Sequence, residues 1–405
     1  MSIVVKVAKT AQELQDAYRL RYQVYHGNGG FEANGSGMIC DHFDSIPCSR
    51  CVVAYANGEA IGTMRVTCDS SIGLPADANF DFTDYRNKVE CEAQSKNITP
   101  LFINAGMLAI APNWRGRRDV FKAIFKIGCD VAKSWGCTHI ISTVNEGTTT
   151  IYRRLGFDIL GEGFFYPPAN QNVVPVASDL KNVFDWAFTE VVDSGGLMAV
   201  FAGEFEYLMV SAGERIFNEG EPGNTAYLIN HGVVNISSEK FGTPTLSLAS
   251  LGAGELFGEM SLIDGGYRSA NATAVGNCEL LVLNNDVFWQ RAQKDANNMR
   301  ALLRLLSDRV RSSGTMAHLY AHGDLHQRLE YFVTKVRQSA IPSTREPSCY
   351  IAKMTIAELA CLACASIEQT ERFMQKLVEL QMAAISVKTI KFYGKADLSQ
   401  LAVDF

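Results

Sequence analysis

The chain has 405 residues, of which 47% are hydrophobic and 20% are charged. These values exclude an intrinsically disordered protein, and the length predicts roughly two to four domains of ordinary size. The formal net charge of −6 excludes a protein that coats nucleic acid through bulk positive charge, although it does not exclude a local basic patch.

The targeting and cysteine patterns indicate a reducing compartment. No basic-then-apolar signal opens the chain, and no apolar run approaches the roughly 18 residues that span a bilayer. We therefore expect a cytoplasmic protein with no membrane partner. The 11 cysteines are an odd number without a disulfide spacing, which predicts reduced thiols. One cluster is close enough in sequence to suggest a metal, but its spacing fits no familiar zinc pattern and we expect no metal there: Cys40, His42, Cys48 and Cys51. The pair Cys361 and Cys364 is expected to pack within a helix.

Strand-like and helix-like segments alternate up to about residue 168, and this alternation predicts an α/β domain. The segments that carry the prediction are 50–56, 60–68, 101–111, 120–135 and 139–144. A polar, proline-bearing stretch over 170–176 follows, and then a helix over 179–192 that precedes Gly195 and Gly196. Together they predict an interdomain connection.

The pattern of predicted secondary structure changes twice in the second half of the chain. Short strand-like runs between glycine-containing turns predict a β-roll or barrel over 210–283. A long helix with a broad apolar face follows to about residue 322, and an α-rich unit closed by a strand pair completes the chain. The expected boundaries are 1–170 for the α/β domain, 171–200 for a linker helix, 201–284 for the roll, 285–323 for the long helix and 324–405 for the last domain.

The chemistry of the roll is concentrated in two short runs, 257–262 and 268–270. A cyclic phosphodiester has one negative charge and two exocyclic oxygens, which suit a guanidinium and free backbone N–H groups. Arg268 and Ser269 can supply that role. Glu259, beside Gly258 where no side chain blocks approach, can accept a hydrogen bond from a ribose hydroxyl.

These residues resemble the phosphate-binding cassette of the cyclic-nucleotide-binding domain, and the run 219–228 resembles that family's glycine-rich hairpin. The resemblance implies a pocket made by Gly258, Glu259, Met260, Ser261, Arg268, Ser269 and Ala270. In that family a serine after the arginine is commoner with cAMP than with cGMP, which favours cAMP as the regulatory ligand. Ser313 or Thr315 on the long helix could reach the adenine edge, or could be solvated helix residues. The alternative for the pocket is an emptied roll whose Glu and Arg pair with each other.

In the last domain, two helix-like runs, 354–360 and 366–373, flank a short break, with Ser366 as the expected N-cap of the second. With the long helix, this pattern resembles the winged helix-turn-helix of the catabolite-activator (CRP/FNR) family, over 210–394. The resemblance implies a homodimer that binds double-stranded DNA through the first turns of the second helix. The DNA-binding residues would be Ser366, Ile367, Glu368 and Arg372.

Several residues depart from that pattern. Ile367 cannot do what a basic residue would do there, Glu371 adds negative charge to a face near phosphates, and Cys364 replaces the usual turn glycine. Residues 324–405 contain 10 Lys and Arg against 9 Asp and Glu, and strong nonspecific DNA binding would need more positive charge. The alternative is a winged helix kept for dimerisation or protein contact.

In the N-terminal domain, a strand over 104–111 leads through 112–118 into a helix, whose free backbone N–H groups could face an anion. Residues 101–135 contain 6 basic and 2 acidic residues, a local positive field. With the run around Tyr152, these motifs resemble the GNAT acyltransferase fold, an α/β sandwich. The resemblance implies acyl-coenzyme A or acyl-carrier protein as the donor and Tyr152 as general acid, the alternative being a core tyrosine. The thioester would contact Arg115, Gly116, Arg117, Arg118 and Asn145.

The runs 20–25, 41–44 and 62–65 resemble the branch that contains N-acyl amino acid synthases and acyl-homoserine lactone synthases. That branch joins a fatty acyl thioester to an amino acid amine. The resemblance implies a substrate site made by Arg21, Asp41, Asp44 and Arg65. The structural alternative is that these four residues form an ion-pair network that holds the N-terminal loop.

Two departures bear on this chemistry. Asn104 replaces the strand acid of that branch and cannot act as a base, so catalysis would use a water, a carboxylate such as Glu90 or Glu92, or an amine that arrives neutral. Arg118 and Val120 replace the small residues of the pyrophosphate loop.

The leading hypothesis is a cAMP-responsive transcription regulator that carries an N-terminal N-acyltransferase domain, with the long helix as the element that changes state. One alternative is an acyltransferase gated by cAMP, whose winged helix serves assembly. The other is a binding-only sensor with an inactive GNAT domain. The expected fold class is α/β plus α+β multidomain: a GNAT-like sandwich, a cyclic-nucleotide-binding β-roll and a winged helix-turn-helix.

Overall fold

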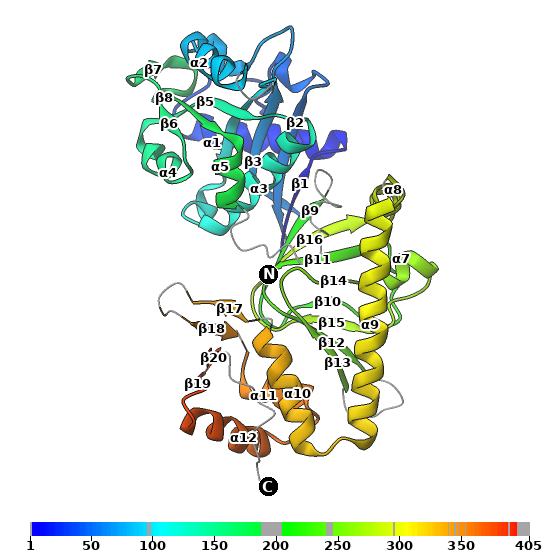
Figure 1. Ribbon diagram of the computed structural model, residues 1–405. Helices are drawn as coiled ribbons and strands as arrows, with labels where there is room; N and C mark the ends of the chain where they lie inside the picture. Colours follow the sequence, from blue (N-terminus) through cyan, green and yellow to red (C-terminus); the bar gives the residue numbers. More distant parts are fainter. Residues whose placement is uncertain are drawn as a thin grey trace. The chain divides into compact units, whose positions relative to one another are not determined.

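The computed structural model describes residues 2–94, 99–187, 205–239, 246–294, 296–338, 340–343, 346, 348–352, 354–387 and 389–394. The chain divides into two units (Figure 1). Unit 1 comprises residues 1–190 and 201–208, and unit 2 comprises residues 191–200 and 209–405.

Unit 1 is built on a sheet whose strands run in the order β1-β2-β3-β4-β5-β8-β6, with β7 paired to β8. Among these pairs only β4 and β5 are parallel. The strands are β1 (Ile3–Val7), β2 (Ser49–Ala56), β3 (Glu59–Cys68), β4 (Phe102–Ile110), β5 (His139–Asn145), β6 (Asp158–Ile159), β7 (Phe164–Tyr166) and β8 (Gln171–Asp179). The helices are α1 (Ala11–Gly27), α2 (Thr83–Gln94), α3 (Arg118–Ser134), α4 (Thr149–Arg154) and α5 (Leu180–Ala187). Short 3-10 turns are η1 (His42–Asp44), η2 (Pro75–Ala78), η3 (Pro112–Trp114), η4 (Glu146–Thr148) and η5 (Pro167–Ala169).

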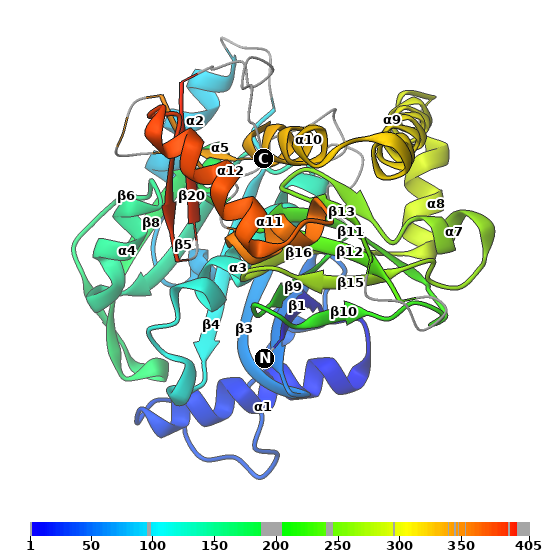
Figure 2. The same cartoon turned by 90° about the horizontal axis from the view of Figure 1, so that it is seen from below.

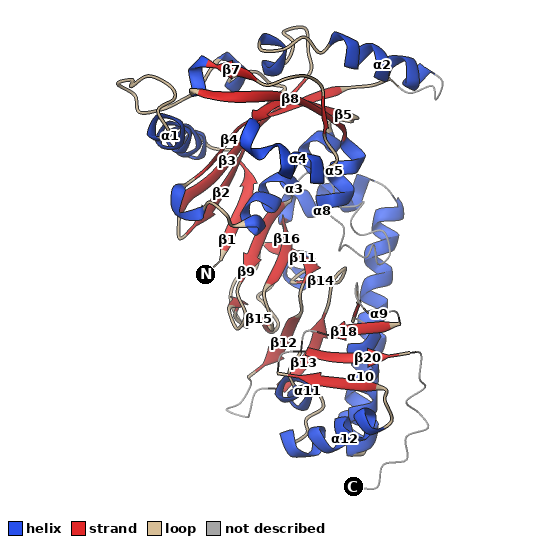
Figure 3. Ribbon diagram, turned by 90° about the vertical axis from the view of Figure 1, so that its left-hand side faces the viewer, coloured by secondary structure: helices blue, strands red, loops and turns tan. Residues whose placement is uncertain are grey.

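Helices α1 and α3 cover opposite faces of this sheet (Figure 3). On the α1 face, Arg21 lies 3.3 Å from the Cys51 Sγ, and Cys51 is the register partner of Arg65. On the α3 face, a Cβ added at Gly62 would come within 2.6 Å of the Ile124 Cδ1. Because side chains alternate along a strand, the α1 face carries Arg65 and, through the β3–β4 register, also Asn104 and Gly106.

Strands β4 and β5 pair over only part of their length. The parallel register joins Phe102–Asn104 to His139–Ile141, although β4 continues to Ile110 and β5 to Asn145. Met107 has a positive φ of 51°, and the β3–β4 register shifts nearby, as expected of a β-bulge. Past Asn104, side chains take up carbonyls of β4, because the Ser142 hydroxyl donates to Ala105 at 2.7 Å and the Tyr25 hydroxyl to Leu108 at 2.9 Å.

The five segments that predicted the α/β domain are all confirmed as strands or as helix α3, within two residues at each end. The interdomain connection is wrong at its start, because the 170–176 stretch is strand β8 of unit 1. It pairs with β5 over seven positions, and Pro175, opposite Thr143, uses its carbonyl to accept the Leu160 N–H. The buried valines of this run outweigh the proline signal. Helix α5 packs on α3, while the rest of the expected helix and Gly195–Gly196 lie outside the described residues.

The described part of unit 2 contains the predicted roll, and strand β9 (Glu206–Val210) belongs to unit 1 up to Leu208 and to unit 2 from Met209. One sheet of the roll has the order β14-β11-β16 and the other the order β10-β15-β12-β13. The strands are β10 (Arg215–Phe217), β11 (Thr225–His231), β12 (Val234–Ser238), β13 (Leu246–Leu251), β14 (Leu256–Phe257), β15 (Asn271–Ala274) and β16 (Cys278–Asn284). The helices are α7 (Met260–Asp264), α8 (Asn285–Lys294) and α9 (Ala296–His322).

The end of the chain is the expected winged helix, with its own apolar core around Leu329, Phe332, Phe373 and Ile390. Helix α11 of this part also packs against β13 of the roll (Figure 2). The elements are α10 (Leu325–Gln338), β17 (Ile341–Pro342), β18 (Cys349–Ala352), α11 (Ile356–Leu362), α12 (Ile367–Glu379), β19 (Ala383–Ser386) and β20 (Thr389–Tyr393), with the strands in the order β17-β18-β20-β19. None of the described helices is long and apolar enough to cross a membrane.

Candidate functional sites

Arg268 is the central cation of the roll. It follows α7, its side chain is 5% exposed, and its guanidinium lies 4.2 Å from the centre of the Phe217 ring. It donates hydrogen bonds to the Gly258 carbonyl at 2.7 Å, the Ser261 hydroxyl at 3.0 Å and the Thr225 hydroxyl at 2.9 Å. All three acceptors are neutral.

Two glycines make room for this side chain. Gly258 has a φ of 73°, and a Cβ there would come within 2.7 Å of the Arg268 Nη1. A Cβ at Gly223, in the hairpin before β11, would come within 2.7 Å of the Arg268 Nε. The hairpin also forms two backbone hydrogen bonds with Arg268. The Gly220 N–H donates to the Arg268 carbonyl, and the Arg268 N–H donates to the Glu221 carbonyl. The glycine-rich hairpin and the cassette therefore enclose one guanidinium.

The two charged residues of the cassette do not pair with each other. Glu259, 1% exposed, pairs with Arg309 of α9, and its Oε2 has no hydrogen-bond partner among the described residues. Within the described ranges, no carboxylate lies at ion-pair distance from Arg268. Burial lowers the pKa of Arg268, although Tyr227, Glu221 and Glu259 oppose the shift. The geometry is therefore not the mutual Glu–Arg pair of the emptied-roll alternative.

The pocket contains every cassette residue that the sequence singled out. Its lining is Phe217, Ile236, Phe257, Gly258, Glu259, Met260, Ser261, Arg268, Ser269, Ala270 and Arg309. Ser313, by contrast, is exposed on α9 outside this lining, and Thr315 uses its hydroxyl to bond the Arg311 carbonyl. The sequence reasoning missed Arg309, which lies one helical turn before Ser313. A basic residue on the helix that covers the pocket was the available signal.

Helix α12 presents the expected DNA-binding residues. The Ser366 hydroxyl accepts the Gln369 N–H at 3.1 Å, which confirms the predicted N-cap. Ile367 is 53% exposed, and Glu368 and Arg372 form an ion pair with side chains 73% and 67% exposed. All of them are accessible to a partner.

The prediction that Cys361 and Cys364 lie on a helix is confirmed for Cys361 alone, and the prediction that they pack is wrong. Cys361 lies in the last turn of α11, Cys364 lies in the turn before α12, and both are exposed. Cys364 has a φ of 47°, the left-handed conformation that the usual glycine adopts there.

The four predicted substrate residues of unit 1 form one ion-pair network. Arg21 donates to Asp44 at 2.8 Å, and Arg65 donates to Asp44 at 2.9 Å and to Asp41 at 2.5 Å. The Nε atoms of both arginines have no acceptor among the described residues. The network ties the η1 segment to α1 and β3.

Burial decides what this network can contact. Arg21 is 0% and Arg65 2% exposed, and the Asp44 side chain is 5% exposed, so Asp41, at 34%, is the most exposed member of the network. Because the guanidinium groups are already neutralised, a substrate carboxylate would have to displace a buried partner. This geometry favours the structural alternative for Arg21, Asp44 and Arg65.

Tyr152 is buried between aromatic rings on α3 and after α4. Its ring centre lies 6.1 Å from that of Phe125 and 5.3 Å from that of Phe157. Burial, with a contribution from Tyr25, raises the pKa of Tyr152, so it remains protonated near neutrality. It can donate a hydrogen bond to a developing thiolate. The Tyr25 hydroxyl itself donates to the Leu108 carbonyl, in the part of β4 that does not pair with β5.

Asn104 is not placed as a base. Its side chain donates to the Ile141 carbonyl at 2.9 Å and is 4% exposed. Glu90 and Glu92, the alternative carboxylates, are exposed on α2.

The expected phosphate loop is partly occupied by a residue of the chain itself. Arg115, Gly116 and Arg117 precede α3 and Arg118 begins it, with Gly116 at a φ of 84°. The Asp119 carboxylate pairs with Arg117 at 2.5 Å and accepts the Val120 N–H, and both contacts lower its pKa, with Arg117 the larger cause. A donor phosphate would compete with this carboxylate for the helix start.

Asn145, the last predicted donor contact, caps a turn instead. Its Oδ1 accepts the Gly147 N–H at 2.8 Å, and its Nδ2 donates to the Gln171 Oε1 at 2.7 Å. Both amide atoms therefore already have partners within unit 1.

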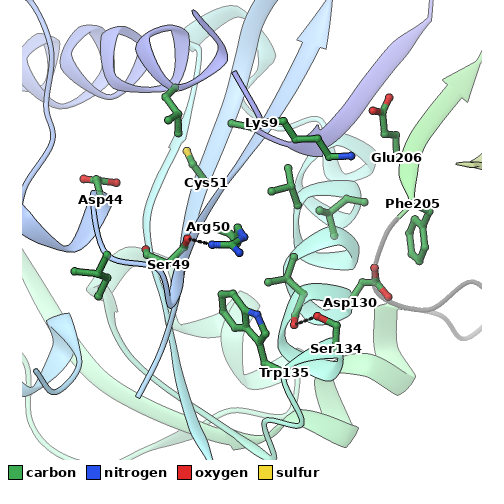
Figure 4. A pocket seen from close by; sticks show the side chains of 16 residues that line it. Lys9, Asp44, Ser49, Arg50, Cys51, Asp130, Ser134, Trp135, Phe205 and Glu206 are labelled. Atoms are coloured by element: carbon green, nitrogen blue, oxygen red, sulfur yellow. Dashed lines mark hydrogen bonds between the residues drawn. The ribbon is translucent and has the colours of Figure 1, made fainter. Parts of the chain in front are cut away.

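A separate cavity of about 580 Å³ opens in unit 1 at the end of β1 and the start of β2 (Figure 4). Figure 4 shows Lys9 and Arg50 with Asp130 and Glu206 around it. The Arg50 guanidinium carbon lies 5.6 Å from the centre of the Trp135 ring. The lining includes Asp44 but neither Tyr152 nor Asn104. Across the described part of the chain, no group of three His, Cys, Asp or Glu residues is placed to hold a metal ion.

Comparisons with known proteins agree with this division. Residues 16–179 match the family model "N-acyl amino acid synthase FeeM", and residues 208–295 match the cyclic nucleotide-binding domain. The "Cyclic AMP receptor protein" of Thermus thermophilus is 32% identical over 202 residues, which cover 49% of this chain and 88% of that protein. The "cAMP-activated global transcriptional regulator CRP" of Haemophilus influenzae is 26% identical over 180 residues, 44% of this chain and 80% of that protein.

A solved structure resembles the N-terminal half. FeeM, an N-acyl amino acid synthase from uncultured soil microbes, aligns at 16% identity and a TM-score of 0.37, over 44% of this chain and 91% of that one. The 32% identity to the Thermus thermophilus receptor, of which this chain covers 88%, shows that the chain belongs to the CRP/FNR family of cyclic-nucleotide-binding regulators, while its residues 16–179 match the model of the FeeM N-acyl amino acid synthase family.

Proposed function

We propose that this protein is a cAMP-responsive transcription regulator whose N-terminal domain transfers a fatty acyl group to an amino acid amine. The observation that carries the regulatory part is Arg268, a buried guanidinium whose hydrogen-bond acceptors among the described residues are all neutral. Burying an unbalanced charge is costly, and a cyclic phosphate supplies the missing negative charge. Glu259, with one carboxylate oxygen unpartnered, is positioned to accept a ribose hydroxyl.

The choice of cAMP is supported by Ser269 and by the names of the two receptor relatives. Calorimetric titration with cAMP and with cGMP tests it. We expect saturable cAMP binding that weakens at least about 100-fold in Arg268→Ala, because a charged hydrogen-bonding partner is lost. The matched control is Arg215→Ala, an exposed arginine on β10 of the same roll. Tighter binding of cGMP would contradict the choice of cAMP, and no binding of either would contradict nucleotide sensing.

DNA binding by α12 is supported by the exposure of its first turns. On α9, Leu303 and Val310 are 56% and 72% exposed and seven residues apart, as in a stripe that pairs with a second copy. We expect a homodimer by sedimentation that Val310→Asp converts to a monomer. Selection from a random DNA library should return a preferred site, and Arg372→Ala should relax that preference while Arg304→Ala, on α9, does not. A library that returns no preference would favour the assembly role.

Acyl transfer is supported by the part of β4 that does not pair with β5 and by the protonated Tyr152. The exposed Arg115, Arg117 and Arg118 suit the phosphate of coenzyme A or an acidic acyl-carrier protein. The test is thiol release from long-chain acyl-carrier protein and acyl-coenzyme A with a panel of amino acids. Loss of a general acid predicts turnover about 100-fold lower in Tyr152→Phe, with donor binding unchanged.

The binding-only sensor is the second candidate, and two observations favour it. Asn104 stands where its branch uses an acid, and Asp119 occupies the helix start that would hold the donor phosphate. Saturable donor binding without turnover for any amino acid would establish this candidate in place of the transferase.

A further inference from the structure

Two exposed thiols lie at the turn between α11 and α12. The Cys364 N–H donates to the Cys361 carbonyl at 3.2 Å, a hydrogen bond between residues three apart. Such a bond closes a turn in which the two Cα atoms lie within about 7 Å. A disulfide needs Cα atoms about 4.4 to 6.8 Å apart. The backbone therefore already brings Cys361 and Cys364 to a separation that a disulfide can bridge.

The backbone at Cys364 is also unusual for a cysteine. Its φ of 47° is left-handed, a conformation that costs a non-glycine residue free energy relative to glycine. The position needs no bulky side chain for packing, because the thiol is exposed. Packing therefore gives no reason for a thiol at this position.

Tyr320 of α9 connects this turn to the roll. Its hydroxyl lies 3.2 Å from the Ser247 carbonyl of β13 and 3.0 Å from the Leu362 carbonyl of α11. Burial, with Cys364, raises the pKa of Tyr320, so it remains a hydrogen-bond donor. One hydroxyl thus touches the long helix, the roll and the helix-turn-helix.

A positive charge lies next to the same turn. Arg328 of α10 donates its Nε to the Ala363 carbonyl at 3.0 Å. Burial and the neighbouring Cys361 raise the pKa of Cys364, and Arg328 opposes that shift only in part. The thiolate is the reactive form in disulfide exchange, and Arg328, next to the turn, is a cation that favours it.

We propose that Cys361 and Cys364 form a reversible disulfide, so that the turn before the DNA-reading helix is a site of redox modification. The reaction partner is a low-molecular-weight disulfide, R–S–S–R. One thiolate attacks it to give a mixed disulfide and the first R–SH; the second thiolate then displaces the second R–S⁻, which takes up a proton. Two thiols are oxidised, one S–S bond of the reagent is broken and reduced, and one S–S bond forms in the protein.

A disulfide would constrain the backbone between Cys361 and Cys364. That segment includes Leu362, whose carbonyl lies 3.0 Å from the Tyr320 hydroxyl, so we expect oxidation to change how α11 is held against β13. Cys364 lies two residues before Ser366, the cap of α12. We therefore expect oxidation to loosen the link between the roll and the helix-turn-helix, and its effect on DNA affinity rests on the proposed function.

Thiol mapping on the full-length protein tests the modification. The reduced protein is equilibrated with mixtures of reduced and oxidised glutathione, free thiols are alkylated, and peptides are analysed by mass spectrometry. We expect a peptide with Cys361 linked to Cys364, absent in Cys361→Ser and in Cys364→Ser. It should persist in Cys91→Ser, which removes an exposed thiol on α2. Separate glutathione adducts on Cys361 and Cys364, or no reaction where Cys91 reacts, would overturn the proposal.

Hydrogen exchange tests the consequence. Oxidation should speed exchange of amides in α11 and the turn by about tenfold, the loss expected for a hydrogen bond. Reduced Tyr320→Phe should show a similar change, and oxidant-treated Cys361→Ser should not. Unchanged exchange after the disulfide has formed would overturn the link to Tyr320.

A measurement of DNA binding distinguishes failure of the proposed function from failure of the disulfide proposal. If the reduced protein binds no DNA, the proposed function fails, while the disulfide mapping still decides the modification. If the reduced protein binds a preferred site, the oxidised protein should bind it about tenfold more weakly. Equal affinity would overturn the regulatory consequence.

Discussion

Both units bury arginine side chains, but they balance the charge in different ways. In unit 1, Arg21 and Arg65 are paired with Asp44 and Asp41. In unit 2, Arg268, at 5% exposed, is also buried, but among the described residues its hydrogen-bond acceptors are one carbonyl and two hydroxyls. The sequence predicted a ligand site at both places, with an ion-pair network as the structural alternative for unit 1 and an emptied roll as the alternative for unit 2.

The presence or absence of a carboxylate partner distinguishes a structural ion-pair network from a binding site. A buried guanidinium that already holds a carboxylate gains little from an anionic ligand, because the ligand must first displace that partner. A buried guanidinium among neutral acceptors gains a full charge partner. The comparison therefore favours the proposed ligand binding at Arg268 and a structural role for the network of unit 1, and the same substitution should destabilise unit 1 far more than ligand-free unit 2.

The largest expected effect is that of Arg21→Met. It leaves the buried Asp44 with one cation fewer, and we expect the free energy of unfolding of unit 1 to fall by about 3–5 kcal/mol. Chemical denaturation monitored by tryptophan fluorescence measures it. Arg19→Met, on the exposed side of α1 with a side chain 48% exposed, is the control and should change it by less than about 0.5 kcal/mol. A loss of unfolding free energy below about 1 kcal/mol for Arg21→Met would contradict a structural role for this ion-pair network.

Arg309→Met should have the next largest effect. It leaves Glu259, 1% exposed, without its cation, and we expect unit 2 to lose about 2 kcal/mol of unfolding free energy in the absence of nucleotide. A double-mutant cycle with Glu259→Gln measures the pair, since the second change removes the stranded charge and should recover part of the loss. Strictly additive losses would show that the two side chains do not interact.

A smaller, pH-dependent effect is expected at Glu13, in the capping box of α1. Burial opposes its ionisation, but hydrogen bonds from Lys6 and from the Lys9 and Thr10 amides lower its pKa from 4.5 to about 2. Because the folded pKa is the lower one, the stabilisation is complete above about pH 4.5 and is lost as the pH falls towards 2. Glu13→Gln should cost about 1 kcal/mol at pH 7. Denaturation at several pH values should show that difference shrinking between pH 4.5 and 2; a constant difference would contradict it.

The smallest expected effect on stability is that of Arg268→Met. No carboxylate is stranded and the volume is kept, so the unfolding free energy of ligand-free unit 2 should change by less than about 1 kcal/mol. The rise in melting temperature that cAMP gives the wild type should disappear. Thermal denaturation with and without cAMP measures both results. A large loss without ligand would place Arg268 in the same structural class as Arg21.

The sequence was a good guide where a site comes from one short segment. The cassette residues from Gly258 to Ala270 lie within one loop, short helix and strand start, so their order along the chain nearly determines their positions in space. The Ser366 cap was predictable for the same reason, because capping is a contact between residues three apart.

The sequence was a poor guide where the contact spans the fold. Arg309 reaches Glu259 from 50 residues away, and Asp119 fills the helix start that the basic loop was expected to offer to a phosphate. The sequence did not predict strand β8, because Pro175 suggested a loop. In the structure Pro175 pairs opposite Thr143, and its carbonyl accepts the Leu160 N–H, so the strand forms without a donor at this position.

By itself, the sequence determined the order of the folded parts and the types of side chain that each site contains, because hydrophobic periodicity, turn glycines and caps act over a few residues. Only the tertiary structure decided which charges are neutralised. A charge is balanced by whichever group lies nearest in space, and in a buried site that neighbour is brought in from a distant part of the chain, as Arg309 is to Glu259.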